Sequence, residues 1–230
     1  MTQTLVVSRD FVERYPGAHA GALVLRGAAN HVACPALDQA RVELEAELRR
    51  KYGGMDRAAL KQLPAIAVYD GYYGHFGKSY HVLLQLESVV FKGKPAGRGS
   101  ALVLAMFLAE LKNQLLTAGH DLAVVQLPVR VEVATGQESY SLLNGQTATL
   151  KADDMFMLDG EGVISSVLYG PDGRTQIGPG TRDVLYVVYA PRGIEPDAVR
   201  RHLEDLAGLV RLAAPEAFIE SLQVSPTASR

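Results

Sequence analysis

The sequence predicts a single mixed α/β (α+β) domain with a β-rich core and flanking helices. In the first half, apolar residues recur every three or four positions over long stretches, as in amphipathic helices. After about residue 126 the chain changes to short β-prone segments separated by turns that contain Gly, Asp or Asn. No internal repeat or long linker divides the 230 residues. We therefore expect one domain over residues 1–225 and a frayed, disordered tail over 226–230.

The first half is expected to open with two strands and a helix. Residues 4–8, TLVVS, form a short β-prone run, and residues 20–30, AGALVLRGAAN, are apolar enough for a buried strand. Within residues 35–54 apolar side chains recur at helical spacing, and two glycines close the run. Glycine commonly follows the C-terminus of a helix, so this segment is predicted to be helical.

Three further helices are predicted before the β-rich half. The first covers residues 56–63 and is closed by Pro64. The second spans 79–93, where five apolar residues share one helical face. The third covers 101–117, with Ser100 as its N-cap. The glycine- and aromatic-rich stretch between the first two is not assigned to an element.

The second half is predicted to be a meander of short strands, followed by a helix and a last strand. The strand segments are rich in Val, Leu, Thr and aromatic residues. They are 127–135, 139–145, 147–152, 155–160, 162–170 and 183–191. An amphipathic helix covers 195–214, starting near Pro196, and the last strand covers 217–225.

Composition narrows the class of protein. The net charge of −2 and the pI of about 6.3 do not indicate the basic surface that nucleic-acid-binding proteins usually carry. One cysteine, Cys34, can form neither an internal disulfide nor a zinc cluster, which fits a reducing compartment. The histidines show no metal-binding spacing, so no metal and no other cofactor is predicted. Without a signal-peptide core or an apolar run of about 18 residues, a cytoplasmic protein outside the membrane is expected.

An ordered series of motifs lies between Asn113 and Pro191. The series comprises the asparagine at a helix end, the pair His120–Asp121, the Gly136–Glu138 turn, the Leu143–Gly145 hairpin, the Asp159–Gly160 turn and Thr181. In this order the motifs resemble the B3/B4 domain, the editing module of the phenylalanyl-tRNA synthetase beta chain. Residues 11–30 and 72–95 resemble the N-terminal half of stand-alone members. The resemblance covers nearly the whole chain and implies a free-standing B3/B4-like member.

The resemblance implies an activity on aminoacylated tRNA. In the synthetase, this domain hydrolyses the ester of tyrosine wrongly attached to phenylalanine tRNA. Such an ester is already activated, so positioning of water and oxyanion stabilisation suffice without a protein nucleophile. The implied partner is therefore tRNA or its aminoacylated 3′ end, and the alternative is a smaller aminoacyl compound.

His120 aligns with the active-site histidine of that family and is the candidate catalytic residue. There it would bind the terminal ribose or orient water as a neutral imidazole. An equally open interpretation is a histidine at a helix C-terminus that interacts with free carbonyl groups. Asp121 would orient His120 or, as we favour, hydrogen-bond its own turn. Asn113 would line the pocket or, as we favour, hydrogen-bond at the helix end.

The loop YGPDGRTQIGPGT supplies further candidate substrate-binding residues. It resembles the archaeal and eukaryotic form of the domain, which implies Arg174, Thr175 and Thr181 at the site. Arg174 would bind a phosphate or carboxylate. The alternative is a surface arginine that is only solvated. The glutamate that reads the tyrosine hydroxyl in bacterial members falls on Val187 here. A site without that acid discriminates tyrosine poorly, so tyrosine editing in particular is not implied.

An aromatic block precedes the helix predicted from Ser79. Its tyrosines Tyr72 and Tyr73 are the best candidates for exposure, and exposed rings beside glycines suit base stacking. The other aromatic residues are expected to pack beneath the helix. Glu138, in the Gly-x-Glu turn, is expected to be structural.

Two hypotheses follow for function. The first is a free-standing hydrolase of mischarged aminoacyl-tRNA esters, centred on His120 with Arg174, Thr175 and Thr181 around it. The alternative is a non-catalytic module that binds an amino acid, a nucleotide or the end of a tRNA. Val187 in place of the acid and the lack of a basic balance favour the alternative.

Overall fold

The computed structural model describes residues 3–31, 33–97 and 99–225, and the tail predicted for 226–230 lies outside the described residues. The helices are α1 (Arg9–Arg14), α2 (Pro35–Tyr52), α3 (Arg57–Lys61), α4 (Pro64–His75), α5 (His81–Lys92), α6 (Ala101–Asn113) and α7 (Pro196–Ala213). The strands are β1 (Leu5–Val7), β2 (His19–Arg26), β3 (Thr117–Asp121), β4 (Val129–Val133), β5 (Ser139–Ser141), β6 (Thr147–Thr149), β7 (Met155–Leu158), β8 (Val163–Ser166), β9 (Gly170–Pro171), β10 (Val184–Ala190) and β11 (Phe218–Ser225).

Two sheets and a hairpin contain these strands. The four-stranded sheet has the order β11-β2-β10-β3 and is antiparallel throughout. The five-stranded sheet has the order β1-β4-β7-β8-β9; β1 and β4 are parallel, and the other neighbours are antiparallel. Strands β5 and β6 form the separate hairpin. The predicted α+β class, a single domain with a β-rich core, is confirmed.

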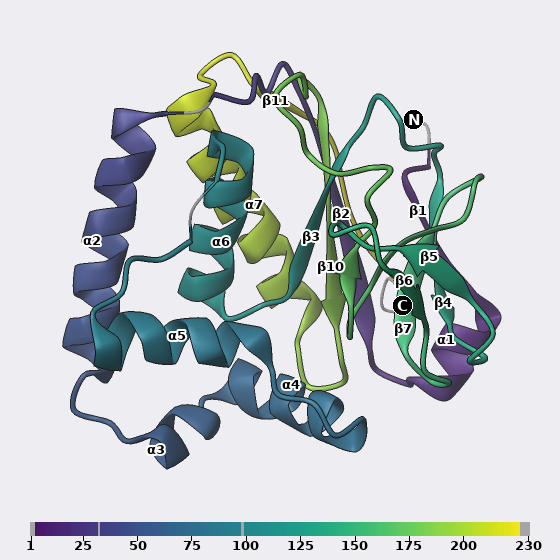
Figure 1. Ribbon diagram of the computed structural model, residues 1–230, viewed down its shortest axis with the longest axis horizontal. Helices are drawn as coiled ribbons and strands as arrows, with labels where there is room; N and C mark the ends of the chain where they lie inside the picture. The colour runs from purple at the N-terminus through teal and green to yellow at the C-terminus, as the bar shows by residue number, and fades with distance from the viewer. Residues whose placement is uncertain (1–2, 32, 98, 226–230) are drawn as a thin grey trace.

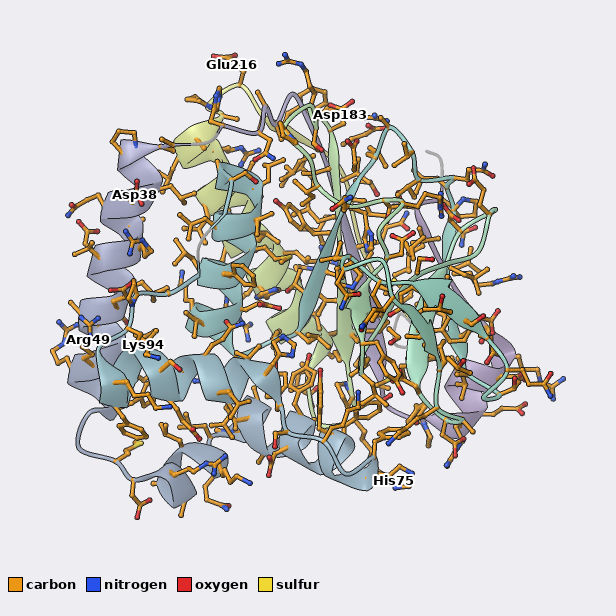
Figure 2. The ribbon with its side chains drawn as sticks, viewed as in Figure 1. Asp38, Arg49, His75, Lys94, Asp183 and Glu216 are labelled. Carbon is orange, nitrogen blue, oxygen red and sulfur yellow. The ribbon has the colours of Figure 1, made fainter. Side chains whose placement is uncertain are left out.

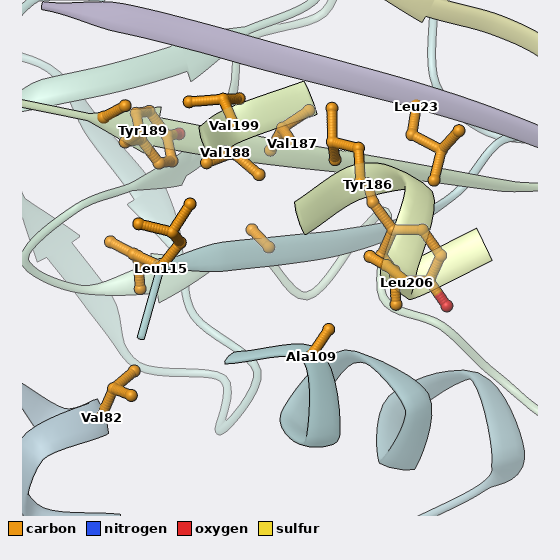
Figure 3. Packing of buried hydrophobic residues seen from close by; sticks show 14 of the residues in the cluster. Leu23, Val82, Ala109, Leu115, Tyr186, Val187, Val188, Tyr189, Val199 and Leu206 are labelled. Atoms are coloured by element: carbon orange, nitrogen blue, oxygen red, sulfur yellow. The ribbon is translucent and has the colours of Figure 1, made fainter. Parts of the chain in front are cut away.

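The four-stranded sheet is the middle layer of the molecule (Figure 1). Helices α6 and α7 cover one face, with α2 outside them, and the five-stranded sheet lies on the other side. The Tyr186 hydroxyl of β10 donates to the Leu102 carbonyl of α6 at 2.9 Å, and Figure 3 shows this ring beside Leu206. The Tyr189 hydroxyl donates in the opposite direction, to the Ser165 carbonyl of β8 at 2.9 Å. Strand β10 is thus buried on both faces, which explains its unbroken apolar sequence.

Charged side chains lie around the rim of the molecule (Figure 2). Asp38 and Arg49 project from α2, and Asp183 and Glu216 lie at the upper edge of the molecule, just before β10 and β11. Positively and negatively charged side chains are therefore mixed around the rim. No helix of the described residues has an apolar stretch long enough to cross a bilayer.

Four of the predicted helices are confirmed, including α3 within the predicted 56–63 and α7 within the predicted 195–214. Helices α2 and α5 occupy the segments predicted to be helical over 35–54 and 79–93. Gly93 ends α5 with a φ of 60°, a left-handed conformation that glycine adopts at little steric cost. Pro64 does not close a helix; it is the first residue of α4, a position where its missing N–H has no helical partner to lose.

The helix predicted over 101–117 is shorter than expected, because α6 ends at Asn113. Gln114 takes a left-handed conformation, with a φ of 60°, and its side-chain amide donates to the Tyr52 hydroxyl at 3.0 Å. Beyond it, Thr117–Asp121 form β3 and pair with β10. Partners distant in sequence set this helix end, so spacing alone did not reveal it.

The predicted exposure of Tyr72 and Tyr73 is wrong. Both residues lie on α4, with exposed fractions of only 9% and 3%. The Tyr72 hydroxyl donates to Asp154 Oδ1 at 2.8 Å, and the Tyr73 hydroxyl donates to the Val167 carbonyl at 2.6 Å. These hydrogen bonds connect α4 to the β-rich half of the chain, so neither ring is exposed on the surface.

Candidate functional site

A cavity of about 390 Å³ lies between α6, β3 and the segment 167–177. This volume falls in the range of sites for small ligands, and the wall is mostly apolar and aromatic. One face of α6 supplies Val103, Met106, Phe107 and Glu110, because residues three or four apart lie on the same side of a helix.

Gly119 of β3 forms part of the wall opposite α6. A Cβ atom at this position would lie 2.7 Å from Ile177 Cδ1 and 3.0 Å from a ring carbon of Tyr186. Only glycine therefore lets the segment that carries Ile177 pack directly against the strand.

Glu110 is the acidic group of the described cavity wall. It is 1% exposed, and its Oε1 accepts the backbone N–H of Thr117 at 2.8 Å. Burial raises the pKa of Glu110 to about 8, and the hydrogen bond from Thr117 opposes this only in part. The carboxyl is therefore mostly protonated at neutral pH.

Two histidines accompany this acid. The Thr117 hydroxyl lies 2.7 Å from Nε2 of His202 on α7. His81 of α5 lines the cavity, with Nδ1 3.3 Å from the Tyr73 hydroxyl. Burial lowers the pKa of each of the two histidines to about 4, so both are neutral and weakly basic at neutral pH.

His120 lies on the face of β3 turned away from the cavity. Its neighbours at positions 117 and 119 line the cavity, and successive residues of a strand point to opposite faces. His120 is fully buried, and its Nδ1 lies 2.7 Å from Thr175 Oγ1. Burial lowers its pKa to about 3. The interpretation of His120 as a helix C-terminal residue is wrong, because it lies within a strand; its catalytic role stays a prediction.

Asp121 and two predicted threonines lie close to His120 at the end of β3. The Thr181 hydroxyl donates to Asp121 Oδ2 at 2.7 Å, and the backbone N–H of Asp121 donates to the Thr175 carbonyl at 2.7 Å. Asp121 Oδ1 also accepts the N–H of Ala123 at 3.0 Å, which is the local turn bond that we favoured. Hydrogen bonds of His120 and Asp121 to Thr175 and Thr181 thus connect β3 to the loop before β10.

Arg174 is already paired with protein carboxylates. Its Nη2 lies 2.8 Å from Asp159 Oδ1, its Nη1 lies 3.4 Å from Glu161 Oε2, and its Nε lies 3.7 Å from Asp172 Oδ2. The guanidinium is therefore neither merely solvated nor free of anionic partners.

The remaining candidates lie apart from this group. Asn113, the last residue of α6, donates from Nδ2 to Asp205 Oδ2 of α7 at 3.0 Å, so its side chain bonds to a neighbouring helix and does not line the cavity. Tyr72 and Tyr73 are both buried on α4, but only Tyr73 lines the cavity. Glu138 is structural as predicted, because its carboxylate accepts the backbone N–H groups of its own turn.

Sequence reasoning missed Glu110 and Thr117. Glu110 was visible as an acid interrupting the apolar run ALVLAMFLAELKNQLL, which argued only against a membrane span. It shares one helical face with Val103, Met106 and Phe107, and a single acid on an apolar face is a signal of a polar contact. Thr117 was assigned to the helix end, which hid its role in β3.

Neither a protein-family model nor a curated protein sequence matches the chain. Its structure is similar to the crystal structure of an N-terminal fragment of the phenylalanyl-tRNA synthetase beta-subunit from Pyrococcus horikoshii, with a TM-score of 0.50 and 12% sequence identity. The likeness covers 99% of this chain and 56% of that fragment, so this chain spans little more than half of its length. At this identity the comparison shows a related fold.

Proposed function

We propose that the chain binds the aminoacyl part of a small aminoacyl compound, or of an aminoacylated tRNA 3′ end, in the cavity beside α6. The cavity carries this proposal, because it has the volume of a ligand site and a mostly apolar wall. Its hydrogen-bonding groups gather at Glu110 and Thr117, which suits a ligand with an apolar body and one polar end.

Binding without chemistry is favoured by the groups that line the cavity. The described wall contains no serine, cysteine or lysine, so an ester bound there could be cleaved only by direct attack of water, which needs a general base. Its one aliphatic hydroxyl, on Thr117, is bonded to a buried histidine. His81 has a pKa lowered by burial to about 4, too low for an efficient general base at neutral pH.

Hydrolysis of a mischarged aminoacyl-tRNA ester is the second candidate function, within a free-standing B3/B4-like domain. The likeness to the synthetase beta-subunit fragment favours it. On this proposal His120, Asp121, Thr175 and Thr181 would position the backbone of β3 and of the following loop, and the cavity would hold the ester and its water. Arg174 would support the same loop through its acidic partners.

Binding and turnover by the purified full chain separate these functions. The assay would measure calorimetric binding of amino-acid esters and deacylation of a panel of mischarged tRNAs. We expect ester binding that is lost in Val103→Phe, which fills the cavity, and kept in Val42→Phe, the same change at an exposed site on α2. Deacylation that Val103→Phe abolishes would establish the second candidate. Absence of binding to every ester and every tRNA would contradict both.

A further inference from the structure

Glu110 carries a hydrogen-bonding capacity that the protein does not use. Its Oε1 accepts the N–H of Thr117, whereas its Oε2 is buried without a hydrogen-bond partner among the described residues. An unpaired buried carboxyl oxygen is unfavourable, and once Glu110 gives up its proton a ligand that donates hydrogen bonds would satisfy this oxygen. Because Glu110 lines the cavity, such a donor can reach it from there.

The groups that face Glu110 contribute no positive charge at neutral pH. They are tyrosines 69 and 73 of α4, Tyr80 before α5, His81 of α5, and His202 of α7 behind Thr117. Burial raises the pKa of the tyrosines and lowers the pKa of both histidines to about 4. All of these groups are therefore neutral between about pH 6 and pH 9.

The described cavity wall contains no lysine or arginine to receive a carboxylate. Lys78 lies beside the wall, but its ammonium donates to the Leu168 carbonyl at 3.2 Å and lies 3.9 Å from the centre of the Tyr169 ring. A ligand with both an ammonium and a free carboxylate would place a second, unpaired negative charge in the cavity once Glu110 ionises to pair with the ammonium. The described wall therefore offers no side-chain cation to pair with a ligand carboxylate.

We propose that Glu110 binds the ammonium group of a ligand that has an apolar body and no free carboxylate. Amino-acid esters and amides, and arylalkyl amines, have this pattern, whereas free amino acids do not. The aromatic and sulfur-containing wall, with Phe107, Tyr169 and Met106, suits an aromatic body. This inference rests on the proposed function, because it names the chemical class that the same cavity selects.

The charge balance of binding follows from the state of Glu110. In the empty cavity burial raises the pKa of this carboxyl to about 8, so it carries a proton at neutral pH. An ammonium ligand keeps its own protons, since an alkylammonium stays charged to about pH 10. The carboxyl then releases its proton to solvent as the carboxylate–ammonium pair forms. Close to one proton is released for each ligand bound.

Calorimetry with two probes of the same shape tests the proposal on the full chain. The probes are 2-phenylethylamine, which has an ammonium, and 2-phenylethanol, which has a neutral hydroxyl. Titrations at pH 7 in two buffers of different ionisation enthalpy report proton release. They are repeated with Glu110→Gln and with the control Glu45→Gln, a buried glutamate of α2 that does not line the cavity.

We expect the amine to bind with proton release, and Glu110→Gln to weaken it at least about tenfold, as for loss of a charge-assisted hydrogen bond. The alcohol should bind both proteins alike, Glu45→Gln should change neither probe, and phenylalanine methyl ester should bind more tightly than phenylalanine. Equal affinities for amine and alcohol in the wild-type protein, without proton release, would overturn the role of Glu110 but leave the cavity as a binding site. That readout does not depend on the variant folding. Absence of binding by every probe would overturn this inference, and absence of binding to the mischarged tRNAs as well would overturn the proposed function.

Discussion

Replacing Glu110 with glutamine should alter how stability depends on pH. Burial raises the pKa of this carboxyl from 4.5 to about 8, and the N–H of Thr117 opposes part of the rise. The folded chain therefore holds the proton more tightly than the unfolded chain does. The resulting stabilisation is complete below the unfolded pKa of 4.5 and is lost as the pH rises through about 8.

The size of the effect follows from the same two pKa values. A tenfold difference in proton affinity corresponds to about 1.4 kcal/mol, so raising the pH from about 6 to about 9 removes roughly 2–3 kcal/mol from the free energy of unfolding. Glu110→Gln keeps the shape of the side chain and an oxygen for the N–H of Thr117, but it has no titrating proton. The stability difference between wild type and variant should therefore change by this amount over that range.

Urea unfolding of both proteins at several pH values measures this difference. Burial lowers the pKa of His81, His120 and His202, and this contribution stabilises the fold as the pH rises through about 6.5. Because the histidines are common to both proteins, subtracting the two pH profiles removes their contribution. A difference that stays constant from about pH 6 to about pH 9 would refute a protonated buried carboxyl at position 110.

Three substitutions test the surroundings of β3 by urea unfolding and ligand calorimetry. His120→Ala should lower the free energy of unfolding by about 2–4 kcal/mol, because a buried ring is lost. It should have little effect on amine affinity. Unchanged stability would count against a packing role for His120. Gly119→Ala should lower the free energy of unfolding by about 1–3 kcal/mol and weaken amine binding, because the added Cβ meets Ile177. Unchanged binding would argue against Gly119 as part of the binding-site wall. Thr181→Val should lower the free energy of unfolding by about 1–2 kcal/mol, because it removes the hydrogen bond to Asp121, and should leave amine affinity unchanged. A tenfold loss of affinity would place Thr181 in the binding site.

The elements that sequence predicted well are those with strong local patterns. Helix α2 has apolar residues at regular spacing, and β10 is a run of β-prone residues covered on both faces. The end of α6 was missed because Gln114 leaves the helix with support from Tyr52, which lies far away in the sequence. Tyr72 was misjudged for the same reason, since its partner Asp154 belongs to the other half of the chain.

The candidate site was predicted only in part. The motif order led to His120, Asp121, Thr175 and Thr181, which do lie together in the fold. It could not show that the side chain of His120 lies on the opposite face of β3 from the cavity, because the segment was expected to be a helix end. Glu110 required knowledge of what packs against α6, which local periodicity does not contain.

The most direct test of the account asks where a bound amine contacts the chain. Nuclear Overhauser effects would be measured between the ring protons of 2-phenylethylamine and the methyl groups of the protein. We predict contacts with Val103, Met106 and Leu116, which line the cavity. Contacts confined to methyl groups on the opposite face of β3, such as that of Thr175, would contradict it and return attention to the surroundings of His120.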